Sequence, residues 1–289
     1  MNSIAQPTLE WRSKRKEAAT AIRSRCSLKP YVGLVLGSGL GALAGEISDA
    51  VTIPYGEIPH FPISTVEGHS GELVLGYLEG VPVIAMNGRF HYYEGYSMQQ
   101  LVFPVWVMRT LGVESFIATN AAGGVNRAFV PGDLMVITDH INWMFDNPLI
   151  GPNDPELGVR FPSMAQAYPW DLVELAQRAA DVEGIHVQRG VYIAVTGPAY
   201  TSRAESEIYR LLRADAVGMS TVPEVMAATH AGMRTLGISC ITDVAKDPKA
   251  GARGILTHEE VLEVANRTKP RFLRLMHAIL RELAKELEA

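Results

Sequence analysis

The stretch Val81-Pro82-Val83-Ile84-Ala85-Met86-Asn87-Gly88-Arg89-Phe90-His91 joins an apolar run to two polar side chains. The run 81–86 predicts a buried strand. Arg89 and His91 are two residues apart, so an extended chain would direct both side chains to the same face. A guanidinium group beside an imidazole suits an anion with several oxygen atoms, phosphate above all. The stretch therefore predicts either an anion site at a strand end or a plain salt-bridge cluster on the surface.

Glu94 follows closely enough in the sequence to reach back to His91. A carboxylate beside an imidazole favours the protonated ring. We therefore expect Glu94 to keep His91 protonated.

The composition is that of an ordinary globular protein, with 289 residues of which 47% are hydrophobic and 20% charged. The net charge of −5 argues against nucleic acid or an anionic membrane surface as a partner. No apolar run approaches the roughly 20 residues of a membrane span, and residues 1–16 lack the apolar core of a secretion signal. Cys26 and Cys240 form neither a metal motif nor a disulfide framework. We expect a cytoplasmic protein.

Predicted strands alternate with predicted helices along the whole chain. The strands are expected at 31–36, 73–78, 81–86, 113–118, 134–138, 191–195, 216–219 and 236–241. Helices are expected at 9–25, 99–111, 171–183 and 204–213. A further helix is expected to begin after the N-cap Thr221, with Glu224 at its third position. The last helix is expected from Thr257 onward, with a break or kink at Pro270. This alternation is typical of an α/β fold, and no linker or repeat divides residues 1–289, so we expect a single domain.

The segment Gly37-Ser38-Gly39-Leu40-Gly41 follows the predicted strand 31–36 and leads into an apolar, helical run. A glycine loop between a strand and a helix can bring backbone N–H groups and a helix N-terminus to a phosphate, although a plain turn has the same pattern. The spacing of Gly37, Gly39 and Ala42 also fits a dinucleotide fingerprint. No acidic residue closes the next strand, however, which argues against a dinucleotide-dependent oxidoreductase.

Five predicted strands are followed by a small or polar residue, namely Ser38, Arg89, Asn120, Ser220 and Asp243. In α/β sheets ligands bind beyond the strand ends, so we expect these residues to surround one site. The residues expected to hold phosphate are Ser38, Arg89, His91 and Ser220. The residues expected beside a flat heterocyclic ring are Tyr200 and Asp243. The alternatives are a core position for Tyr200 and a cap or an ion pair with Arg203 or Lys246 for Asp243.

Longer motifs carry a resemblance from about residue 32 to residue 262. They are 36–41, Gly68-His69-Ser70-Gly71, 88–96, 119–126, 147–154, 218–224 and 258–261. With them the chain resembles the purine nucleoside phosphorylases of the trimeric, low-molecular-mass type, in the nucleoside phosphorylase superfamily. The resemblance implies a mixed central β-sheet flanked by helices and a homotrimer. It also implies that phosphate displaces the base of a purine ribonucleoside or 2′-deoxyribonucleoside, with no cofactor and no metal.

The resemblance also assigns roles to residues of this chain. The phosphate-binding residues that it implies are Ser38, His69, Arg89, His91, Ser220 and the backbone N–H of Ala121. The nucleoside-binding residues that it implies are Tyr93, Asn120, Phe161, Tyr200, Thr201, Met219, Thr242, Asp243 and His258. The catalytic residues are expected to be His91, Asp243 and Glu94.

Some of these roles are more specific. Tyr93 and Met219 would contact the ribose, and His258 would bind the 5′-hydroxyl. Phe161 would reach into the site of a neighbouring subunit. The alternatives are plain packing for Met219 and a helix-capping position alone for His258.

Two positions depart from the family members that act on 6-oxopurines. Thr201 stands where those members have glutamate, and Asp243 stands where they have asparagine. An ionised Asp243 could accept from a 6-amino group and a protonated one could donate to N7, whereas an ionised carboxylate would repel a 6-oxo group. We therefore expect adenosine to be a substrate.

Other interpretations remain at this stage. The same two positions resemble the phosphorylases of methylthioadenosine or methylthioinosine, but an unpaired His258 imidazole against their thioether would cost about 1–3 kcal/mol. A nucleosidase would use water in place of phosphate, against which Arg89 and His91 argue. A nucleoside-binding protein without catalysis would not need the anion-binding residues.

Overall fold

The computed structural model describes residues 5–65, 70–244 and 257–288. Within these residues nine strands form one sheet in the order β2-β3-β4-β1-β5-β8-β7-β6-β9. The strands are β1 (Val32–Leu36), β2 (Ser48–Pro54), β3 (Glu72–Leu78), β4 (Val81–Asn87), β5 (Ser115–Gly124), β6 (Leu134–Asn142), β7 (Val187–Ala194), β8 (Ala216–Gly218) and β9 (Arg234–Val244). Both parallel and antiparallel neighbours occur, so the expected mixed central sheet of an α/β fold is confirmed.

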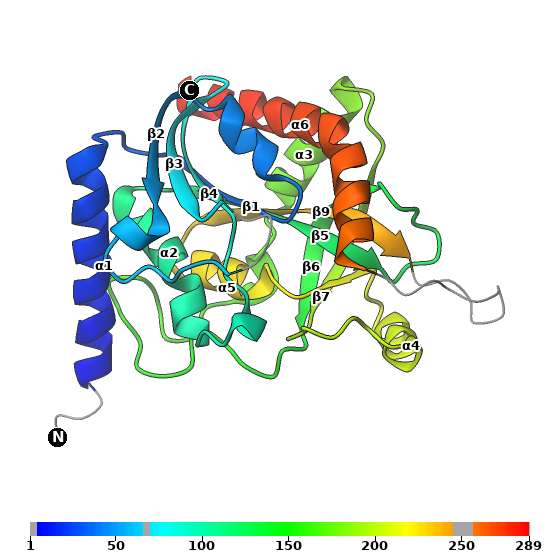
Figure 1. Ribbon diagram of the computed structural model, residues 1–289, viewed down its shortest axis with the longest axis horizontal. Helices are drawn as coiled ribbons and strands as arrows, with labels where there is room; N and C mark the ends of the chain where they lie inside the picture. Colours follow the sequence, from blue (N-terminus) through cyan, green and yellow to red (C-terminus); the bar gives the residue numbers. More distant parts are fainter. Residues whose placement is uncertain (1–4, 66–69, 245–256, 289) are drawn as a thin grey trace.

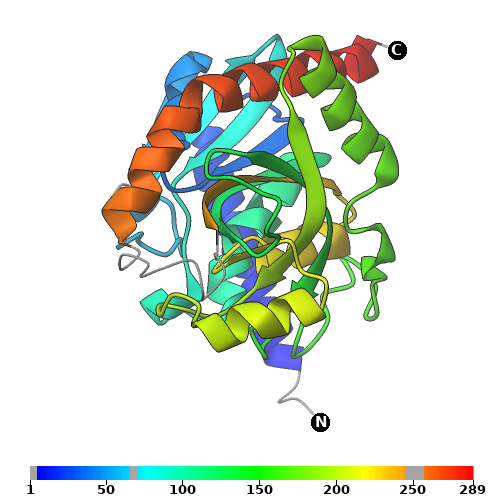
Figure 2. The same cartoon turned by 90° about the vertical axis from the view of Figure 1, so that its right-hand side faces the viewer.

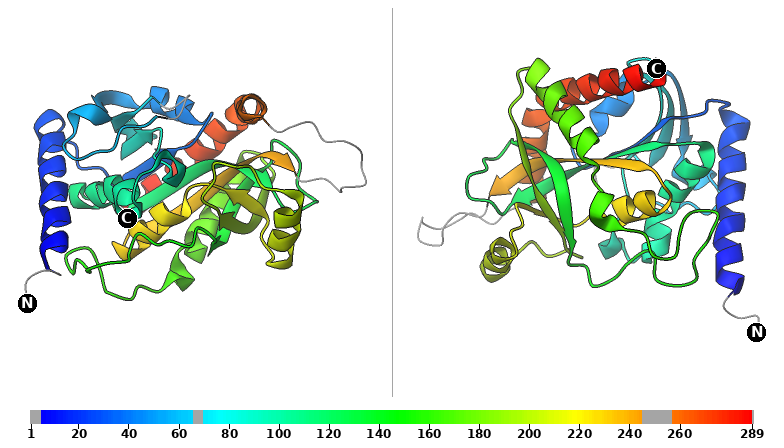
Figure 3. Two further views of the ribbon diagram at one scale, coloured as in Figure 1. Left: turned by 60° about the horizontal axis from the view of Figure 1, so that its bottom comes forward. Right: turned by 180° about the vertical axis from the view of Figure 1, so that it is seen from behind.

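Helices cover both faces of this sheet (Figure 1). The α-helices are α1 (Ala5–Arg25), α2 (Met98–Leu111), α3 (Trp170–Val182), α4 (Arg203–Leu211), α5 (Val222–His230) and α6 (His258–Glu288). The short 3₁₀ helices are η1 (Gly41–Glu46), η2 (Tyr55–Glu57), η3 (Tyr92–Glu94) and η4 (Met164–Gln166). Helices α3 and α6 pack together on one face, and α2 packs with α5 on the other. Figure 2 shows α4 below the strands and α6 above them, and Figure 3 shows α1 and α4 at opposite edges of the molecule.

The apolar run 81–86 forms most of β4, the buried strand that was predicted. It follows β3 through the two-residue turn Glu79-Gly80, in which both residues have positive φ, at 50° and 77°. Such two-residue turns match the twist of antiparallel strands. Helix α6 begins with the predicted capping box between Thr257 and Glu260 and continues past Pro270, with a visible bend in Figure 1.

Some local predictions were wrong, among them the following. The glycine loop after β1 leads into η1, a 3₁₀ helix of six residues, and not into an α-helix. Strand β2 begins two residues later, so no long helix dipole points at the loop. Strand β5 continues from the predicted end at residue 118 to Gly124, because the small residues 121–124 pair with β9 and their last two also with β8.

The sheet partly closes on itself. Strand β9 pairs in parallel with β5 and antiparallel with β6, so β5, β8, β7, β6 and β9 form a ring. The strands β4, β1, β5 and β9 all run parallel to their neighbours in this group. Their carboxyl ends therefore meet at one edge of the sheet. No helix within the described ranges is long and apolar enough to cross a membrane.

Candidate active site

A cavity of about 470 Å³ lies at the edge where these strands end. All of the five polar residues at predicted strand ends line it. The predicted site residues that line this cavity are Ser38, Arg89, His91, Tyr93, Asn120, Ala121, Tyr200, Thr201, Met219, Ser220, Thr242, Asp243 and His258. Strand β8 runs antiparallel to β5, so the chain that follows β8 continues alongside β5 toward Asn120. This brings Ser220 to the cavity.

Arg89 is the most deeply buried charge of the cavity, with 1% of the residue exposed. Its Nη1 donates to the backbone oxygen of Thr119 at 2.7 Å and to Ser220 Oγ at 3.2 Å. Its Nε and Nη2 donate to the two oxygens of Glu224, at 3.2 Å and 2.9 Å. A paired guanidinium of this kind has a fixed orientation, which suits it to hold a tetrahedral anion.

Glu224 is the residue of this site that sequence reasoning missed. It was predicted at the third position of α5, as part of the N-terminal cap. The N-cap position of Thr221 is confirmed, but its side chain makes no capping hydrogen bond. The Glu224 carboxylate forms a salt bridge with Arg89 instead. The signal in the sequence was an acidic residue in the first turn of an otherwise apolar helix, in a chain that needs a counterion for Arg89.

His91 lies between an aromatic ring and a carboxylate. Its ring stacks on Tyr93 with 4.7 Å between centroids and an interplanar angle of 12°. Its Nδ1 is 3.2 Å from Glu94 Oε1, and its backbone N–H donates to the same oxygen at 2.6 Å. Glu94 reaches back as predicted, and its other oxygen accepts from the Thr65 backbone N–H and hydroxyl at 2.9 Å and 2.6 Å. Glu94 therefore acts on the cavity through His91 and does not line it.

The expectation that Glu94 keeps His91 protonated was wrong. Burial lowers the pKa of His91 below its ordinary value and outweighs the opposing effect of the hydrogen bond that the ring donates to Glu94, while Arg89 lowers the pKa further. Burial by itself would raise the pKa of Glu94, but hydrogen bonds from His91 and Thr65 lower it to about 2. The pair therefore consists of a neutral imidazole and an ionised carboxylate at neutral pH.

The same cavity is also lined by side chains suited to a flat ring. Tyr200 is 46% exposed, so the alternative of a core aromatic is wrong. Asp243 on β9 pairs with Gly123 on β5, where an added Cβ would lie 3.0 Å from Asp243 Oδ1. Burial raises the pKa of Tyr93 to about 12, which keeps this phenol neutral beside the cavity.

Phe161, a predicted nucleoside-binding residue, does not line this cavity. Phe161 is 87% exposed and borders a separate hollow together with Leu149 and Met226. His69 and Lys246 lie outside the described residues, as does the predicted loop 246–256. Among the residues that the structure describes, no group of three or more His, Cys, Asp or Glu side chains could hold a metal ion.

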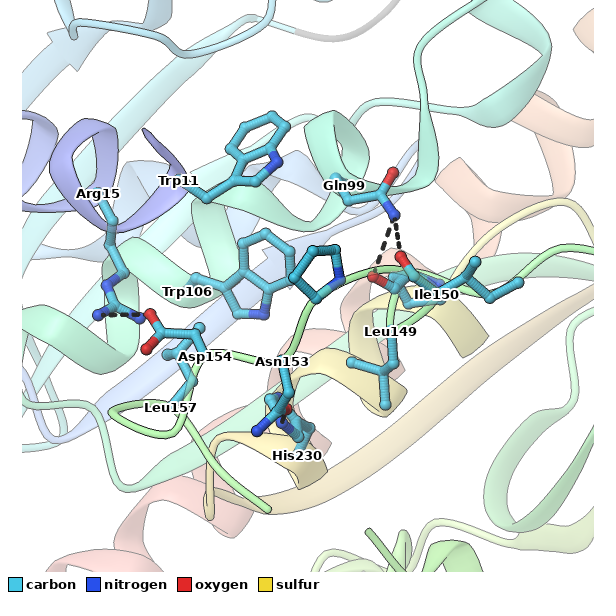
Figure 4. A pocket seen from close by; sticks show the side chains of 12 residues that line it. Trp11, Arg15, Gln99, Trp106, Leu149, Ile150, Asn153, Asp154, Leu157 and His230 are labelled. Atoms are coloured by element: carbon cyan, nitrogen blue, oxygen red, sulfur yellow. Dashed lines mark hydrogen bonds and ion pairs between the residues drawn. The ribbon is translucent and has the colours of Figure 1, made fainter. Parts of the chain in front are cut away.

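A second cavity, of about 250 Å³, lies between α1, α2 and the segment 148–157 (Figure 4). Trp11 and Trp106 form its walls, and Gln99 holds the segment through hydrogen bonds to two backbone oxygens. Arg15 and Trp106 each have buried nitrogen atoms that lack hydrogen-bond partners in the described part of the chain. Packing seals these atoms, so a molecule in the cavity could not reach them. The cavity at the strand ends is therefore the better candidate for chemistry.

Comparison with known proteins identifies the family to which the chain belongs. Residues 31–281 match the family model of the phosphorylase superfamily. Purine nucleoside phosphorylase 1 of Geobacillus stearothermophilus is 55% identical over 278 residues, which are 95% of this chain and 99% of the relative.

Solved structures extend the likeness to the fold. The purine nucleoside phosphorylase of Schistosoma in complex with hypoxanthine has a TM-score of 0.89 at 38% identity, over 94% of this chain and 97% of that chain. The Schistosoma mansoni enzyme in complex with adenosine has the same TM-score and coverage at 39% identity. By sequence and by fold, the chain belongs to the phosphorylase superfamily and, within it, to the purine nucleoside phosphorylases.

Proposed function

We propose that this enzyme catalyses the phosphorolysis of purine ribonucleosides and 2′-deoxyribonucleosides, yielding the free base and (deoxy)ribose 1-phosphate. The observation that carries the proposal is the composition of one cavity. Arg89, His91 and Ser220 line it together with Tyr200 and Asp243. An anion site next to a ring-binding site is the arrangement that a reaction between phosphate and a nucleoside requires.

The reaction follows from this arrangement. Phosphate attacks the anomeric carbon of the ribose as the bond to the base breaks, and positive charge develops on the sugar. A phosphate anion fixed by Arg89, Ser38 and Ser220 stabilises that charge and then captures the carbon, so positioning and electrostatics supply most of the rate enhancement. In the phosphate complex His91 is the imidazolium: its Nδ1–H stays on Glu94, which orients the ring, and its other ring N–H donates to a phosphate oxygen. Phosphate is the second substrate, and the reaction needs no cofactor.

The rest of the nucleoside is held by the remaining residues of the cavity. The Ala121 backbone N–H and His69 complete the phosphate site. Tyr93 and Met219 contact the ribose, and His258 binds the 5′-hydroxyl. Asn120, Thr201 and Thr242 complete the nucleoside site. The His258 imidazole favours a hydroxyl over a methylthio group at this position, because the thioether would leave its nitrogen unpaired.

Adenosine is a substrate in this proposal. Thr201 and Asp243 replace the glutamate and asparagine of the 6-oxopurine enzymes. Asp243 accepts from a 6-amino group when ionised and donates to N7 when protonated. The relatives from Schistosoma were solved with hypoxanthine and with adenosine, so enzymes of this fold accommodate both 6-oxo and 6-amino purines.

The proposed assembly is a homotrimer in which Phe161 closes the nucleoside site of a neighbouring subunit. What supports it is the position of this ring, which is 87% exposed and does not line its own subunit's cavity. A phenyl ring so exposed gains by burial against a nucleoside in another subunit.

A substrate panel tests the function. Adenosine, inosine and methylthioadenosine are incubated with the enzyme, with and without phosphate, and the released base is measured. We expect release from adenosine only when phosphate is present, and a collapse of release in the Arg89→Gln variant. Release without phosphate would identify a nucleosidase, binding without release would identify a nucleoside-binding protein, and inosine far ahead of adenosine would refute the role given to Asp243.

A further inference from the structure

The backbone between β8 and α5 contains a rare turn. Thr221 has φ 70° and ψ −52°, and the backbone N–H of Val222 donates to the oxygen of Ser220 at 2.8 Å. A three-residue turn with these angles is a γ-turn of the strained kind. Positive φ is especially unfavourable for a β-branched residue such as threonine. A strained conformation persists only where surrounding contacts hold it in place, and it often marks a functional site.

The contacts that hold this turn come from β5. Thr221 is completely buried, and its Oγ1 accepts a hydrogen bond of 2.8 Å from Nδ2 of Asn120, which is itself 1% exposed. The amide nitrogen of Asn120 is therefore committed to the turn, although the residue also lines the cavity. The Thr221 hydroxyl does not cap α5. It accepts a hydrogen bond from Asn120 on the neighbouring strand β5 instead.

The turn determines where the preceding hydroxyl points. Ser220 Oγ lies 3.2 Å from Arg89 Nη1 and 3.3 Å from Thr221 Oγ1. Three residues after the turn, Glu224 holds the opposite edge of the same guanidinium group. An ordinary helical or extended backbone at Thr221 would rotate Ser220 relative to α5 and separate the two groups that meet Arg89.

We propose that the γ-turn at Thr221, held by Asn120, is the positioning device that directs the Ser220 hydroxyl beside Arg89 for phosphate binding. Thr221 and Asn120 act through Ser220 and are positioning residues. The proposal rests on the proposed function, because it takes phosphate as the anion of this site.

The test uses the full-length enzyme and the Thr221→Val variant, which keeps the branched shape but removes the hydroxyl. Phosphate affinity is measured by calorimetry, and KM is measured for phosphate and for adenosine. We expect phosphate binding to weaken about tenfold, while KM for adenosine stays within about twofold. Thr221→Ser keeps the hydroxyl and should restore the phosphate affinity.

Two further variants separate positioning from a general loss of structure. Thr229→Val removes a buried hydroxyl that has no hydrogen-bond partner in the described residues, on the same helix α5, and should leave phosphate binding unchanged. Asn120→Ala should weaken phosphate binding as Thr221→Val does, and the double variant should be no weaker than Thr221→Val alone. If Thr221→Val does not fold, Asn120→Ala is compared with the wild type by phosphate affinity alone, because Asn120 also lines the nucleoside site, and an unchanged phosphate affinity would then overturn the proposal.

Unchanged phosphate affinity in Thr221→Val, or additive effects in the double variant, would overturn the proposal. An equal rise in KM for both substrates would also overturn it, because it would indicate a general disturbance of the site. Failure of the proposed function has a different signature, since the wild type would then bind phosphate without releasing a base. A wild type that does not bind phosphate would overturn both.

Discussion

At the scale of single residues, the charge of the candidate site depends on His91. Arg89 is paired with Glu224, and the carboxylate of Glu94 contacts the His91 ring. Burial lowers the pKa of His91, and Arg89 lowers it further, while the hydrogen bond that the ring donates to Glu94 opposes both effects. His91 is therefore the group of this cluster whose charge can change near neutral pH.

The titration of His91 predicts that phosphate binding depends on pH. Because the pKa of His91 lies below its ordinary value of about 6.5, the ring is neutral at pH 7. A bound phosphate favours the imidazolium, so protonation and anion binding strengthen each other. We expect KM for phosphate to fall as the pH is lowered from about 8 toward about 6.

The control is the His91→Gln variant, which has no titrating ring. The ionisation of phosphate itself is the same for both enzymes, so it cancels in the ratio of their KM values. The ratio of the wild-type KM to the variant KM should fall as the pH is lowered. Parallel profiles for the two enzymes would mean that His91 keeps one charge state throughout the cycle.

At the scale of elements, the first turn of α5 connects two parts of the fold. Glu224 in this helix holds Arg89, which follows β4, and the turn before the helix contacts β5 through Asn120. The Arg89 and Glu224 side chains are 1% and 3% exposed. Removal of one member of such a buried pair leaves an unpaired charge inside the protein.

We therefore predict that Glu224→Ala lowers the free energy of unfolding by about 3–5 kcal/mol, measured by urea denaturation. Phosphate should restore part of the loss, because it supplies a negative charge to Arg89. Glu207→Ala is the control, since Glu207 is 48% exposed and forms surface pairs with Arg210 and Arg127. Surface pairs contribute about 0–1 kcal/mol, so comparable losses in the two variants would contradict a special role for the buried pair.

The elements also show what could be predicted from the sequence. Apolar runs such as 81–86 identified buried strands, because a strand covered on both faces needs apolar residues throughout. The extension of β5 to Gly124 was missed, since Ala121 to Gly124 carry no apolar pattern and are held by backbone pairing with β8 and β9. The role of Glu224 was missed for a related reason. Its local pattern fits a helix cap equally well, and only the tertiary fold brings it to Arg89.

At the scale of the whole molecule, the candidate site is assembled from segments between residues 38 and 258. The sequence could predict that polar residues at strand ends lie together, because parallel strands deliver their carboxyl ends to one edge. It could not predict the charge of His91. That charge depends on burial by residues distant in sequence, and burial here outweighs the neighbouring Glu94. In the proposed trimer, the place of Phe161 depends on more than one chain.

The proposed trimer predicts that a subunit lacking Phe161 can be completed by a neighbour. Phe161→Ala should raise KM for adenosine about tenfold, because an aromatic wall of the nucleoside site is lost, and should leave phosphate affinity unchanged. Val182→Ala serves as the control, since Val182 is similarly exposed at 82% but lies at the end of α3. Light scattering should give the mass of three chains for the wild type and for both variants.

Mixed assemblies test the exchange directly. Phe161→Ala subunits keep the anion site, whereas Arg89→Gln subunits keep the phenyl ring. When the two are unfolded together and refolded, some cavities with Arg89 will lie next to a neighbour that carries Phe161, and these should turn over adenosine with the KM of the wild type. If each site were built from one chain, no such population would form, and the mixture would show only the raised KM of Phe161→Ala. A mixture without low-KM activity would therefore place Phe161 outside the neighbouring site.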